Sequence, residues 1–358
     1  MTNEIRFGSS VVGDAHPTYF IADIAANHDG SFERAVALIR LAKESGADAA
    51  KFQNFQASKI VSDYGFRTLE SGGKQAHQAT WKKSVFEIYS EYSISQDWTQ
   101  RLKQECDRAG IDYFSSPYDF ESVDHLDPYV DVYKIGSGDI TWIEMLEFIG
   151  RKGKPVMLAT GAASIGDVQR AVTALSRVNS QLVVMQCNTN YTASLENYSH
   201  VNLRVLETYR AMFPQVVLGL SDHKFGLATT LGAVTLGARV IEKHFTDDNA
   251  RLGPDHKFAM NPSTWRDMVD RTRELERALG TGNKQVESNE MESIVVQQRC
   301  LRAAADLKPG QELSREHIEV LRPCPHDGIR PFQLDDVLGR KVRVPLKAGQ
   351  HVKWSDLT

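Results

Sequence analysis

Two short segments of the chain each end an apolar run with a histidine. VVLGLSDH covers residues 216–223, and RVIEKHFTDD covers residues 239–248. Imidazole nitrogens with carboxylates nearby, and with coordination positions left open for a substrate oxygen, suit Mn²⁺, Fe²⁺, Zn²⁺ or Co²⁺. A single histidine at a strand end is usually a hydrogen-bonding residue, but two on neighbouring strands favour a metal. The sequence therefore predicts a divalent metal held by His223 and His244.

The neighbours of these histidines can be sorted by strand geometry, because side chains two residues apart point to the same face of a β-strand. Ser221 and Glu242 therefore share a face with the histidines, and Glu242 is a candidate catalytic residue. Asp222 and Lys243 face the other way. We expect Asp222 to orient a histidine or to cap the following turn rather than to bind metal.

Two lysines, Lys51 and Lys134, lie in otherwise apolar strand candidates. A buried ammonium is costly unless it is paired with an anion or deprotonated. Lys134 begins the segment KIGSGD, whose small residues let backbone N–H groups approach a phosphate. The pattern indicates a phosphorylated substrate. The alternative is that both lysines pair with Asp23 and Glu242 in a purely structural network.

Further polar residues close the same strand candidates and are predicted to face one mouth. They are Asp23, Gln53, Ser116, Ser137, Thr160, Thr189 and Tyr191. Asp255, in the segment GPDHKF, is a candidate for a hydrogen bond to a polyhydroxylated ligand. Its position after Gly-Pro is equally typical of an ordinary turn.

The elements that must position these residues alternate between short β-rich runs and amphipathic helical patterns from residue 18 onward. This alternation indicates parallel βα units. Eight strand candidates begin near residues 19, 48, 112, 130, 155, 182, 216 and 239. Eight units within about 280 residues predict an α/β fold, a closed (β/α)8 TIM barrel, with catalytic groups at the carboxyl ends of its strands. No GxGxxG motif follows the first strand, which argues against a dinucleotide-binding fold.

Residues 56–94 form a long polar and aromatic insertion after the second strand candidate. A loop of this length in a compact barrel is usually either functional or disordered. Because the insertion follows the carboxyl end of a strand, we expect it to act as a lid or to contact the substrate. A merely structural excursion is the alternative.

The helical and strand patterns change after Gly282. We expect a catalytic barrel over residues 1–282, a polar linker over residues 283–298 and a small β-rich domain over residues 299–358. The small domain contains a short internal repeat, LKPGQELSREHIEV and LKAGQHVKWSDLT. Two related halves packed together suit a compact β-rich module.

The overall composition excludes several classes of protein. The chain has 358 residues, a formal net charge of −4, 41% hydrophobic and 25% charged residues. It therefore lacks the basic field that nucleic acid or an anionic membrane requires. No apolar run approaches the roughly 20 residues that span a bilayer, and the N-terminus does not resemble a signal peptide. Four widely spaced cysteines indicate reduced thiols. We expect a soluble, cytoplasmic protein.

Taken together, several segments resemble the sialic acid synthases, and more broadly the nonulosonic acid synthases. These segments are IADIAANHDGSFERA, KFQNF, YKIGSGD, GLSDH, VIEKHFTDD, GPDHKFAMNP and VLRP, which run in family order from residue 20 to the C-terminus. The resemblance implies a TIM barrel followed by an antifreeze-like (SAF) domain. It also implies a domain-swapped homodimer in which each SAF domain covers the partner's barrel mouth.

The same resemblance implies roles for individual residues. His223 and His244 would bind the metal, Mn²⁺ first and Mg²⁺ or Co²⁺ as alternatives. Phosphoenolpyruvate would be held by Lys51, Lys134, Ser137 and Ser221. The N-acetylated hexose would face Gln53, Ser116, Tyr191, Glu242 and Asp255, and Arg322 would reach the sugar's N-acyl group from the other subunit. The implied reaction is attack of C3 of phosphoenolpyruvate on the metal-polarised aldehyde, then addition of water at C2 and loss of phosphate.

The chain departs from the family pattern at three places. Asp23 stands where many members have glutamate, and Ala159, in the segment ATG, stands where serine is common. The segment CNTNY stands where CTN or CTS is usual, and it leaves open which of residues 188–190 contacts phosphoenolpyruvate. None of these changes affects the histidines or lysines, so they indicate a variant of specificity.

Two other functions remain open at this point. A Schiff-base aldolase would use Lys51 or Lys134 as its nucleophile, and TIM barrels host that chemistry. A non-catalytic sugar-binding protein would have the same pocket without turnover. The sequence also leaves the acceptor open between N-acetylmannosamine and a diacetamido-trideoxyhexose of the legionaminic or pseudaminic type.

Overall fold

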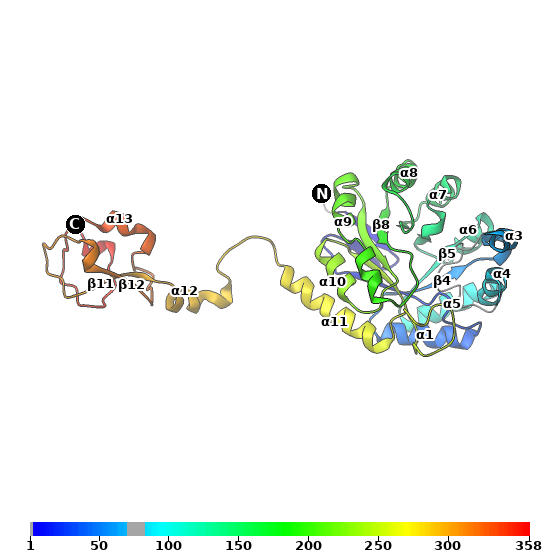
Figure 1. Cartoon of the computed structure of the whole chain (residues 1–358), viewed down its shortest axis with the longest axis horizontal. Coiled ribbons are helices and arrows are strands. Elements are labelled where there is room, and N and C mark those ends of the chain that lie inside the picture. Colours follow the sequence, from blue (N-terminus) through cyan, green and yellow to red (C-terminus); the bar gives the residue numbers. More distant parts are fainter. Residues whose placement is uncertain (1–2, 70–82) are drawn as a thin grey trace. The chain divides into compact units, whose positions relative to one another are not determined.

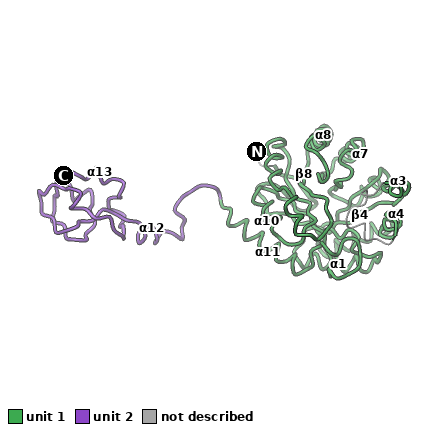
Figure 2. Tube along the Cα trace, viewed as in Figure 1, with its two compact units in different colours: residues 1–280 green, residues 281–358 purple. Residues whose placement is uncertain are grey.

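The structure is a computed structural model that describes residues 3–69 and 83–358. The chain divides into two compact units, residues 1–280 and residues 281–358, which Figure 2 colours green and purple. Each unit has a hydrophobic core of its own. The two units are therefore described separately.

The first unit is a closed barrel of eight parallel strands in the order β10-β3-β4-β5-β6-β7-β8-β9 (Figure 1). The strands are β3 (Tyr19–Asp23), β4 (Ala49–Asn54), β5 (Asp112–Pro117), β6 (Tyr133–Ile135), β7 (Val156–Ala159), β8 (Leu182–Cys187), β9 (Val217–Asp222) and β10 (Val240–His244). The predicted TIM barrel is confirmed, and all eight predicted strands are present.

Alternation along the strands divides the barrel residues into two sets. Tyr19 and Ile21 of β3 pack into the barrel interior, whereas Phe20 and Ala22 pack outward against the helices. Toward the amino ends of the strands, the barrel interior is apolar and includes Phe114. On β3, β4, β5, β6, β9 and β10, inward positions nearer the carboxyl end carry polar residues, Asp23, Lys51, Ser116, Lys134, Ser221 and Glu242, whereas β7 has Ala159 there. Strand register alone therefore brings these polar side chains to one mouth.

A short hairpin closes the opposite end of the barrel. Strands β1 (Glu4–Phe7) and β2 (Ser10–Gly13) pair in antiparallel fashion. Phe7 is fully buried, with ring centroids 5.4 Å from Tyr19 and 5.7 Å from Phe114. The sequence analysis did not predict this hairpin, whose strands have only four residues each.

Eight helices surround the barrel. They are α1 (Phe32–Glu44), α5 (Gln96–Ala109), α6 (Phe120–Leu126), α7 (Ile143–Gly150), α8 (Ile165–Ser176), α9 (Val205–Met212), α10 (Ala228–Thr235) and α11 (Pro262–Leu279). The last helix shows how the sequence sets its limits. Asn261 caps its N-terminus in a capping box, Pro262 occupies the first turn, and Gly280, with φ of 60°, ends it.

Where the structure describes it, the insertion between β4 and α5 contains three further helices. They are α2 (Ala57–Ile60), α3 (Asp63–Thr68) and α4 (Val85–Tyr92). Residues 70–82 of the predicted insertion lie outside the described residues. Short 3-10 helices also follow two strands, η2 (Ser137–Asp139) after β6 and η3 (Leu195–His200) after β8.

The second unit is small and rich in short elements. They are η4 (Ser288–Glu290), α12 (Met291–Gln297), β11 (Cys300–Ala303), η5 (Arg315–His317), β12 (Ile318–Leu321), η6 (Pro331–Gln333), α13 (Leu334–Val337) and η7 (Trp354–Asp356). The two copies of the internal repeat meet in this unit. Leu307 and Leu346, the first residues of the two copies, form an antiparallel bridge and are both buried. The repeat therefore corresponds to two paired halves around one core.

In the part of the chain that the structure describes, no helix is long and apolar enough to cross a membrane.

Candidate active site

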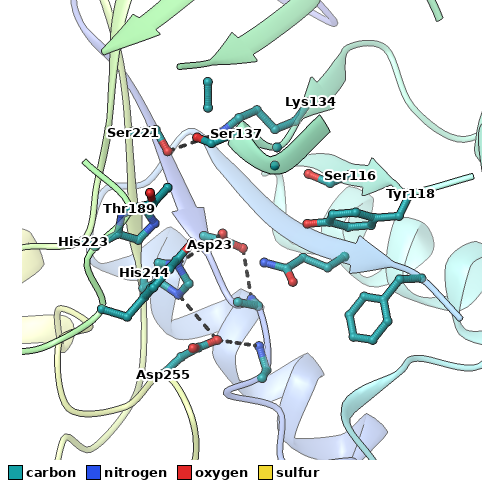
Figure 3. A pocket seen from close by; sticks show the side chains of 18 of the residues that line it. Asp23, Ser116, Tyr118, Lys134, Ser137, Thr189, Ser221, His223, His244 and Asp255 are labelled. Carbon is teal, nitrogen blue, oxygen red and sulfur yellow. Dashed lines mark hydrogen bonds and ion pairs between the residues drawn. The ribbon is translucent and has the colours of Figure 1, made fainter. Parts of the chain in front are cut away.

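The carboxyl ends of the barrel strands surround a cavity of about 450 Å³. Figure 3 shows His223, His244 and Asp255 on one side of it and Tyr118 on the opposite side. The predicted site residues that line this pocket are Asp23, Lys51, Gln53, Ser116, Lys134, Ser137, Thr189, Tyr191, Ser221, His223, Glu242, His244 and Asp255. They come from seven of the eight barrel strands or their following loops, all except β7. A single pocket therefore collects nearly all of the predicted residues.

An ionic network forms the floor of the pocket. Lys51 Nζ lies 2.7 Å from Asp23 Oδ2, its register neighbour on β3, and 3.7 Å from Glu242 Oε1. Lys134 Nζ lies 2.5 Å from the same Glu242 oxygen, which also accepts a hydrogen bond from Ser221 Oγ at 3.2 Å. The pairing that we considered as a structural alternative is thus present. All of these side chains nevertheless face the cavity.

Burial and charge act in opposite directions on the pKa values of this network. Burial lowers the pKa of Lys134. Burial also acts to lower the pKa of Lys51, but Asp23 and Glu242 outweigh it and the pKa is raised. For Glu242, burial acts to raise the pKa, and the two lysines outweigh it and lower the pKa. The pKa of Asp23 is raised by burial despite Lys51. Asp23 is therefore the carboxyl of this group that most readily carries a proton.

The two histidines are neighbours above this floor, with ring centroids 5.3 Å apart. Burial lowers the pKa of each to about 3, so both imidazoles are neutral. His223 Nδ1 lies 3.2 Å from the carbonyl oxygen of Asn188. If Nδ1 donates to this carbonyl, Nε2 of His223 carries the free lone pair that a metal requires.

His244 lies between two carboxylates. Its Nε2 is 3.7 Å from Asp23 Oδ2 and its Nδ1 is 3.7 Å from Asp255 Oδ2. Among the described residues, this buried Nδ1 has no hydrogen-bond partner. An orphaned nitrogen on a neutral imidazole is consistent with a missing ligand.

No group of three or more His, Cys, Asp or Glu side chains within residues 3–69 and 83–358 is arranged to hold a metal by itself. If the two imidazoles hold a metal, substrate or water oxygens would have to complete its coordination.

The Asp255 side chain is held in the pocket by a hydrogen bond from a backbone amide. Its Oδ2 accepts a hydrogen bond from the Ala26 N–H at 3.3 Å. Burial raises its pKa to about 7. Asp255 lines the pocket, and its hydrogen bond to a polyhydroxylated ligand stays a prediction.

Two glycine-containing turns lie side by side at the pocket wall. Ser137 Oγ, in the turn after β6, accepts a hydrogen bond from the Gly161 N–H, in the turn after β7, at 2.9 Å. A Cβ atom on Gly161 would lie 2.5 Å from Thr189 Cγ2 and 2.9 Å from Ser137 Oγ. Glycine is therefore required for the close approach of these turns.

The expectation that Thr160 faces the mouth is wrong. Its hydroxyl donates to the Met185 carbonyl at 2.9 Å and accepts a hydrogen bond from Tyr209 at 2.9 Å, on the helix side of the sheet. The reason is strand alternation, because Met157 packs inward on β7. Ala159 then lines the pocket, and Thr160 must point outward.

The prediction for Asp222 is confirmed. Its two oxygens accept hydrogen bonds from the Lys224 N–H, from Thr229 Oγ1 and from Lys243 Nζ, and it does not line the pocket. It caps the turn that follows β9. Arg322 is an exposed residue of the second unit, and its predicted contact with a sugar in the partner's barrel stays a prediction.

The sequence analysis expected the insertion over residues 56–94 to act as a lid or to contact the substrate, but it did not name the residues of one wall of the pocket. The residues of this wall are Phe55, Ile60, Ile88, Tyr89, Tyr92, Tyr118 and Asp139. Tyr118 could have been found, because it stands two residues after Ser116 and so shares its face. Asp139 ends the quoted segment KIGSGD. The other residues belong to the insertion or its edge, where no strand alternation indicates which side chains face inward.

The sequence profile of the NeuB family matches residues 38–284, and that of the SAF domain matches residues 298–358. The first match covers more than half of the chain. The chain belongs to the NeuB family. The SAF domain that the resemblance implied is confirmed at the C-terminus.

Members and neighbours of the NeuB family are similar over almost the whole chain. N,N'-diacetyllegionaminic acid synthase of Legionella pneumophila is 32% identical, with 96% of this chain and 96% of that protein covered. Human N-acetylneuraminate-9-phosphate synthase is also 32% identical, over 94% of this chain and 91% of its own. The crystal structure of N-acetylneuraminic acid synthetase from Leptospira borgpetersenii has a TM-score of 0.71 and 27% identity, covering 82% of this chain and 96% of that one.

Proposed function

We propose that this NeuB-family chain condenses phosphoenolpyruvate with the open-chain form of an N-acetylated hexose. The products are a nine-carbon 3-deoxy-2-keto sugar acid and phosphate. The observation that carries the proposal is the meeting of two lysines and two neutral histidines in one pocket. Relatives named as legionaminic acid and N-acetylneuraminate-9-phosphate synthases support the same reaction class.

His223 and His244 are the residues that would hold the divalent metal, Mn²⁺ or alternatively Mg²⁺ or Co²⁺. Their neutral state and the orphaned Nδ1 of His244 fit such an ion. A bound divalent metal would polarise the aldehyde oxygen of the sugar as a Lewis acid.

Lys51 and Lys134 would bind the phosphate and carboxylate groups of phosphoenolpyruvate. Ser137 and Ser221 would add hydrogen bonds, and Thr189 stands beside Ser137 at the same wall. When phosphoenolpyruvate binds, the lysines would pair with its phosphate and carboxylate groups and give up part of their pairing with Asp23 and Glu242. Because these fixed charges lie in a buried site, they stabilise the developing negative charge more strongly than water does.

The reaction forms one carbon–carbon bond, and at C2 it forms one carbon–oxygen bond to water and breaks the carbon–oxygen bond to phosphate. C3 of phosphoenolpyruvate attacks the aldehyde carbon, and the aldehyde oxygen takes up a proton to become a hydroxyl. Water adds at C2, and phosphate leaves with the former enol oxygen. Asp23 is suited to hold the transferred proton on Oδ2, because burial raises its pKa.

The sugar would be oriented by Gln53, Ser116, Tyr191, Glu242 and Asp255, which line the pocket. Arg322 would contact its N-acyl group from the SAF domain of the other subunit of a domain-swapped homodimer. The homodimer and a cytoplasmic location are parts of the proposal that rest on the resemblance and the composition.

The proposal is tested by incubating the protein with phosphoenolpyruvate, Mn²⁺ and a panel of N-acetylated hexoses while phosphate is measured. Release that depends on both a hexose and the metal, and that His223→Ala abolishes, is the expected result. Absence of release with every hexose, or full activity of His223→Ala, would contradict the proposal. Calorimetry that detects sugar binding without turnover under saturating metal would instead support a non-catalytic sugar-binding protein.

A Schiff-base aldolase is the second candidate, and one observation favours it. Burial lowers the pKa of Lys134, as is usual for lysines that form imines. Borohydride reduction in the presence of a keto-acid substrate would then trap a covalent adduct. Loss of that adduct in Lys134→Met, together with activity that survives chelation, would favour the aldolase over the synthase.

A further inference from the structure

The insertion gives the pocket one wall that differs from the rest. Phe55, Ile60, Ile88 and Tyr89 line the pocket beside Tyr118. Phe55 packs against both tyrosines, with ring centroids 5.4 Å from Tyr89 and 5.8 Å from Tyr118. We call these five residues the aromatic wall. It presents two aliphatic side chains and three aromatic rings to the cavity.

The aromatic wall offers no free positive charge. The cations of the described insertion are Lys59, Arg67 and Lys83, and none of them lines the pocket. Lys59 Nζ lies 2.5 Å from Glu121, and Arg67 lies 2.9 Å from Asp63. Lys83 pairs with Glu91. Each cation of this part of the insertion thus already has a carboxylate partner.

The other ionic groups of the pocket do not supply a second anion site. Among the residues that the structure describes, the lysines and arginines that line the cavity are Lys51 and Lys134, and both belong to its floor. The lining carboxyls beyond that floor are Asp139 and Asp255. Asp139, whose carboxylate and the Tyr118 ring both lie beside Gly136, would repel a dianionic phosphate rather than bind it, whereas Asp255 lies beside His244.

The positions of the histidines and lysines determine how an acceptor sugar must be oriented in the pocket. Its aldehyde has to meet the histidines and lysines, so the opposite end of the sugar points away from them. Figure 3 shows Tyr118, part of the aromatic wall, across the pocket from His223 and His244. The aromatic wall is therefore the surface that meets the far end of the sugar.

Resting on the function proposed above, we infer that the acceptor is an uncharged hexosamine whose far end carries methyl-bearing groups. A 2,4-diacetamido-2,4,6-trideoxyhexose has this chemistry, with an acetamido methyl and a deoxy methyl. A hexosamine 6-phosphate has the opposite chemistry at the same end. The wall buries methyl groups favourably and cannot replace the hydration of a phosphate.

The test compares three acceptors with phosphoenolpyruvate and Mn²⁺: N-acetylmannosamine, its 6-phosphate, and 2,4-diacetamido-2,4,6-trideoxymannose. We expect kcat/KM to be highest for the trideoxy sugar, by about tenfold or more over N-acetylmannosamine, and lowest for the 6-phosphate. If kcat/KM for the 6-phosphate equals or exceeds kcat/KM for the neutral sugars, the inference is overturned, whereas the proposed synthase function stands. Phosphate release with none of the three would overturn the synthase and the inference together.

A charge placed on the wall gives a second measurement. In Ile88→Lys, the ratio of kcat/KM for the 6-phosphate to that for the trideoxy sugar should rise about tenfold, because an ammonium then faces the far end of the sugar. Ser90→Lys is the matched control, since Ser90 is an exposed residue of the same helix α4 and does not line the pocket. It should leave the ratio unchanged. An unchanged ratio in folded Ile88→Lys, or an equal rise in both variants, would overturn the placement of the sugar.

Discussion

Glu242 is the residue on which both interior lysines converge. Its Oε1 is 2.5 Å from Lys134 Nζ and 3.7 Å from Lys51 Nζ, and its side chain is buried. Its Oε2 has no hydrogen-bond partner among the described residues. Glu242 therefore serves the fold by balancing the buried charge of both lysines.

Glu242→Gln should destabilise the protein by about 3 kcal/mol, because it leaves the buried ammonium of Lys134 without a counter-charge, whereas Lys51 keeps Asp23. Urea unfolding measures this change. Glu207→Gln is the control, since the Glu207–Arg204 pair is 3.7 Å long and exposed, and such pairs contribute less than about 1 kcal/mol. Equal stability of Glu242→Gln and wild type would show that Lys134 is not charged in the free protein.

His223→Ala and His244→Ala should each lower the affinity for Mn²⁺ by tenfold or more, about the effect of losing one of two protein ligands. Titration calorimetry of the protein without substrates measures it directly. His200→Ala, at an exposed position outside the pocket, should bind Mn²⁺ like wild type. If all three variants bind equally well, the imidazole pair is not the metal site.

His28 makes stability depend on pH in a defined window. It is buried, accepts a hydrogen bond from the Gly30 N–H at 3.1 Å, and contacts Trp98 edge-on. Burial lowers its pKa from 6.5 to about 4. The unfolded chain then binds the proton more tightly than the folded chain does. The contribution of His28 to stability is complete above pH 6.5 and is lost as the pH falls from 6.5 to 4.

His28→Asn keeps a hydrogen-bond acceptor but cannot take up the proton. Its free energy of unfolding should therefore fall less steeply than that of wild type between pH 6.5 and 4. His223 and His244 have lowered pKa values of the same sign, so some acid sensitivity will remain in the variant. Parallel pH profiles of the two proteins would contradict the role of His28.

At the scale of elements, the turns after β6 and β7 must touch for Ser137 to reach the Gly161 N–H. Gly161→Ala should separate them, since its Cβ would lie 2.5 Å from Thr189 and 2.9 Å from Ser137. We expect a loss of about 2 kcal/mol in stability and a higher KM for phosphoenolpyruvate.

Gly166→Ala provides the comparison for Gly161→Ala. Gly166 lies in the first turn of α8, where an added Cβ meets nothing closer than 3.6 Å. That substitution should be neutral or stabilising by up to about 1 kcal/mol. If Gly161→Ala leaves the KM for phosphoenolpyruvate unchanged, the two turns are not part of the substrate site.

The elements of the barrel are predictable because each parallel strand is an apolar run followed by an amphipathic helix. Strand alternation also predicts the facing of Ser221, Glu242 and Asp222. Thr160 was misplaced because alternation on β7, counted from the inward Met157, puts Ala159 inward and Thr160 outward. For another reason, the hairpin of β1 and β2 was not predicted, and the insertion was expected to reach the substrate without its pocket residues being named. Their positions depend on packing against distant segments, which no local pattern records.

At the scale of the whole molecule, the two units have independent cores. Leu301, Val337 and Val342 belong to the core of the second unit, whereas the first unit packs around its barrel. The proposed homodimer makes a prediction that a monomeric site does not. If Arg322 acts on the partner's barrel, the two halves of one active site come from different chains.

Mixing inactive His223→Ala with inactive Arg322→Ala, under conditions that allow subunits to exchange, should then restore activity that neither variant has alone. In the mixed dimer, the intact barrel of the Arg322→Ala chain receives the intact SAF domain of the His223→Ala chain. Phosphate release before and after mixing measures the effect. Lack of recovery despite demonstrated exchange would mean that Arg322 acts within its own chain or not at all.

The most direct test of the central claim is the mass of the product formed from phosphoenolpyruvate, Mn²⁺ and the preferred hexosamine. The account predicts a single product with the mass of the acceptor plus pyruvic acid, formed together with one phosphate and absent when His223→Ala replaces the wild-type protein. Phosphate released with free pyruvate and unchanged hexosamine, or no phosphate at all, would contradict it.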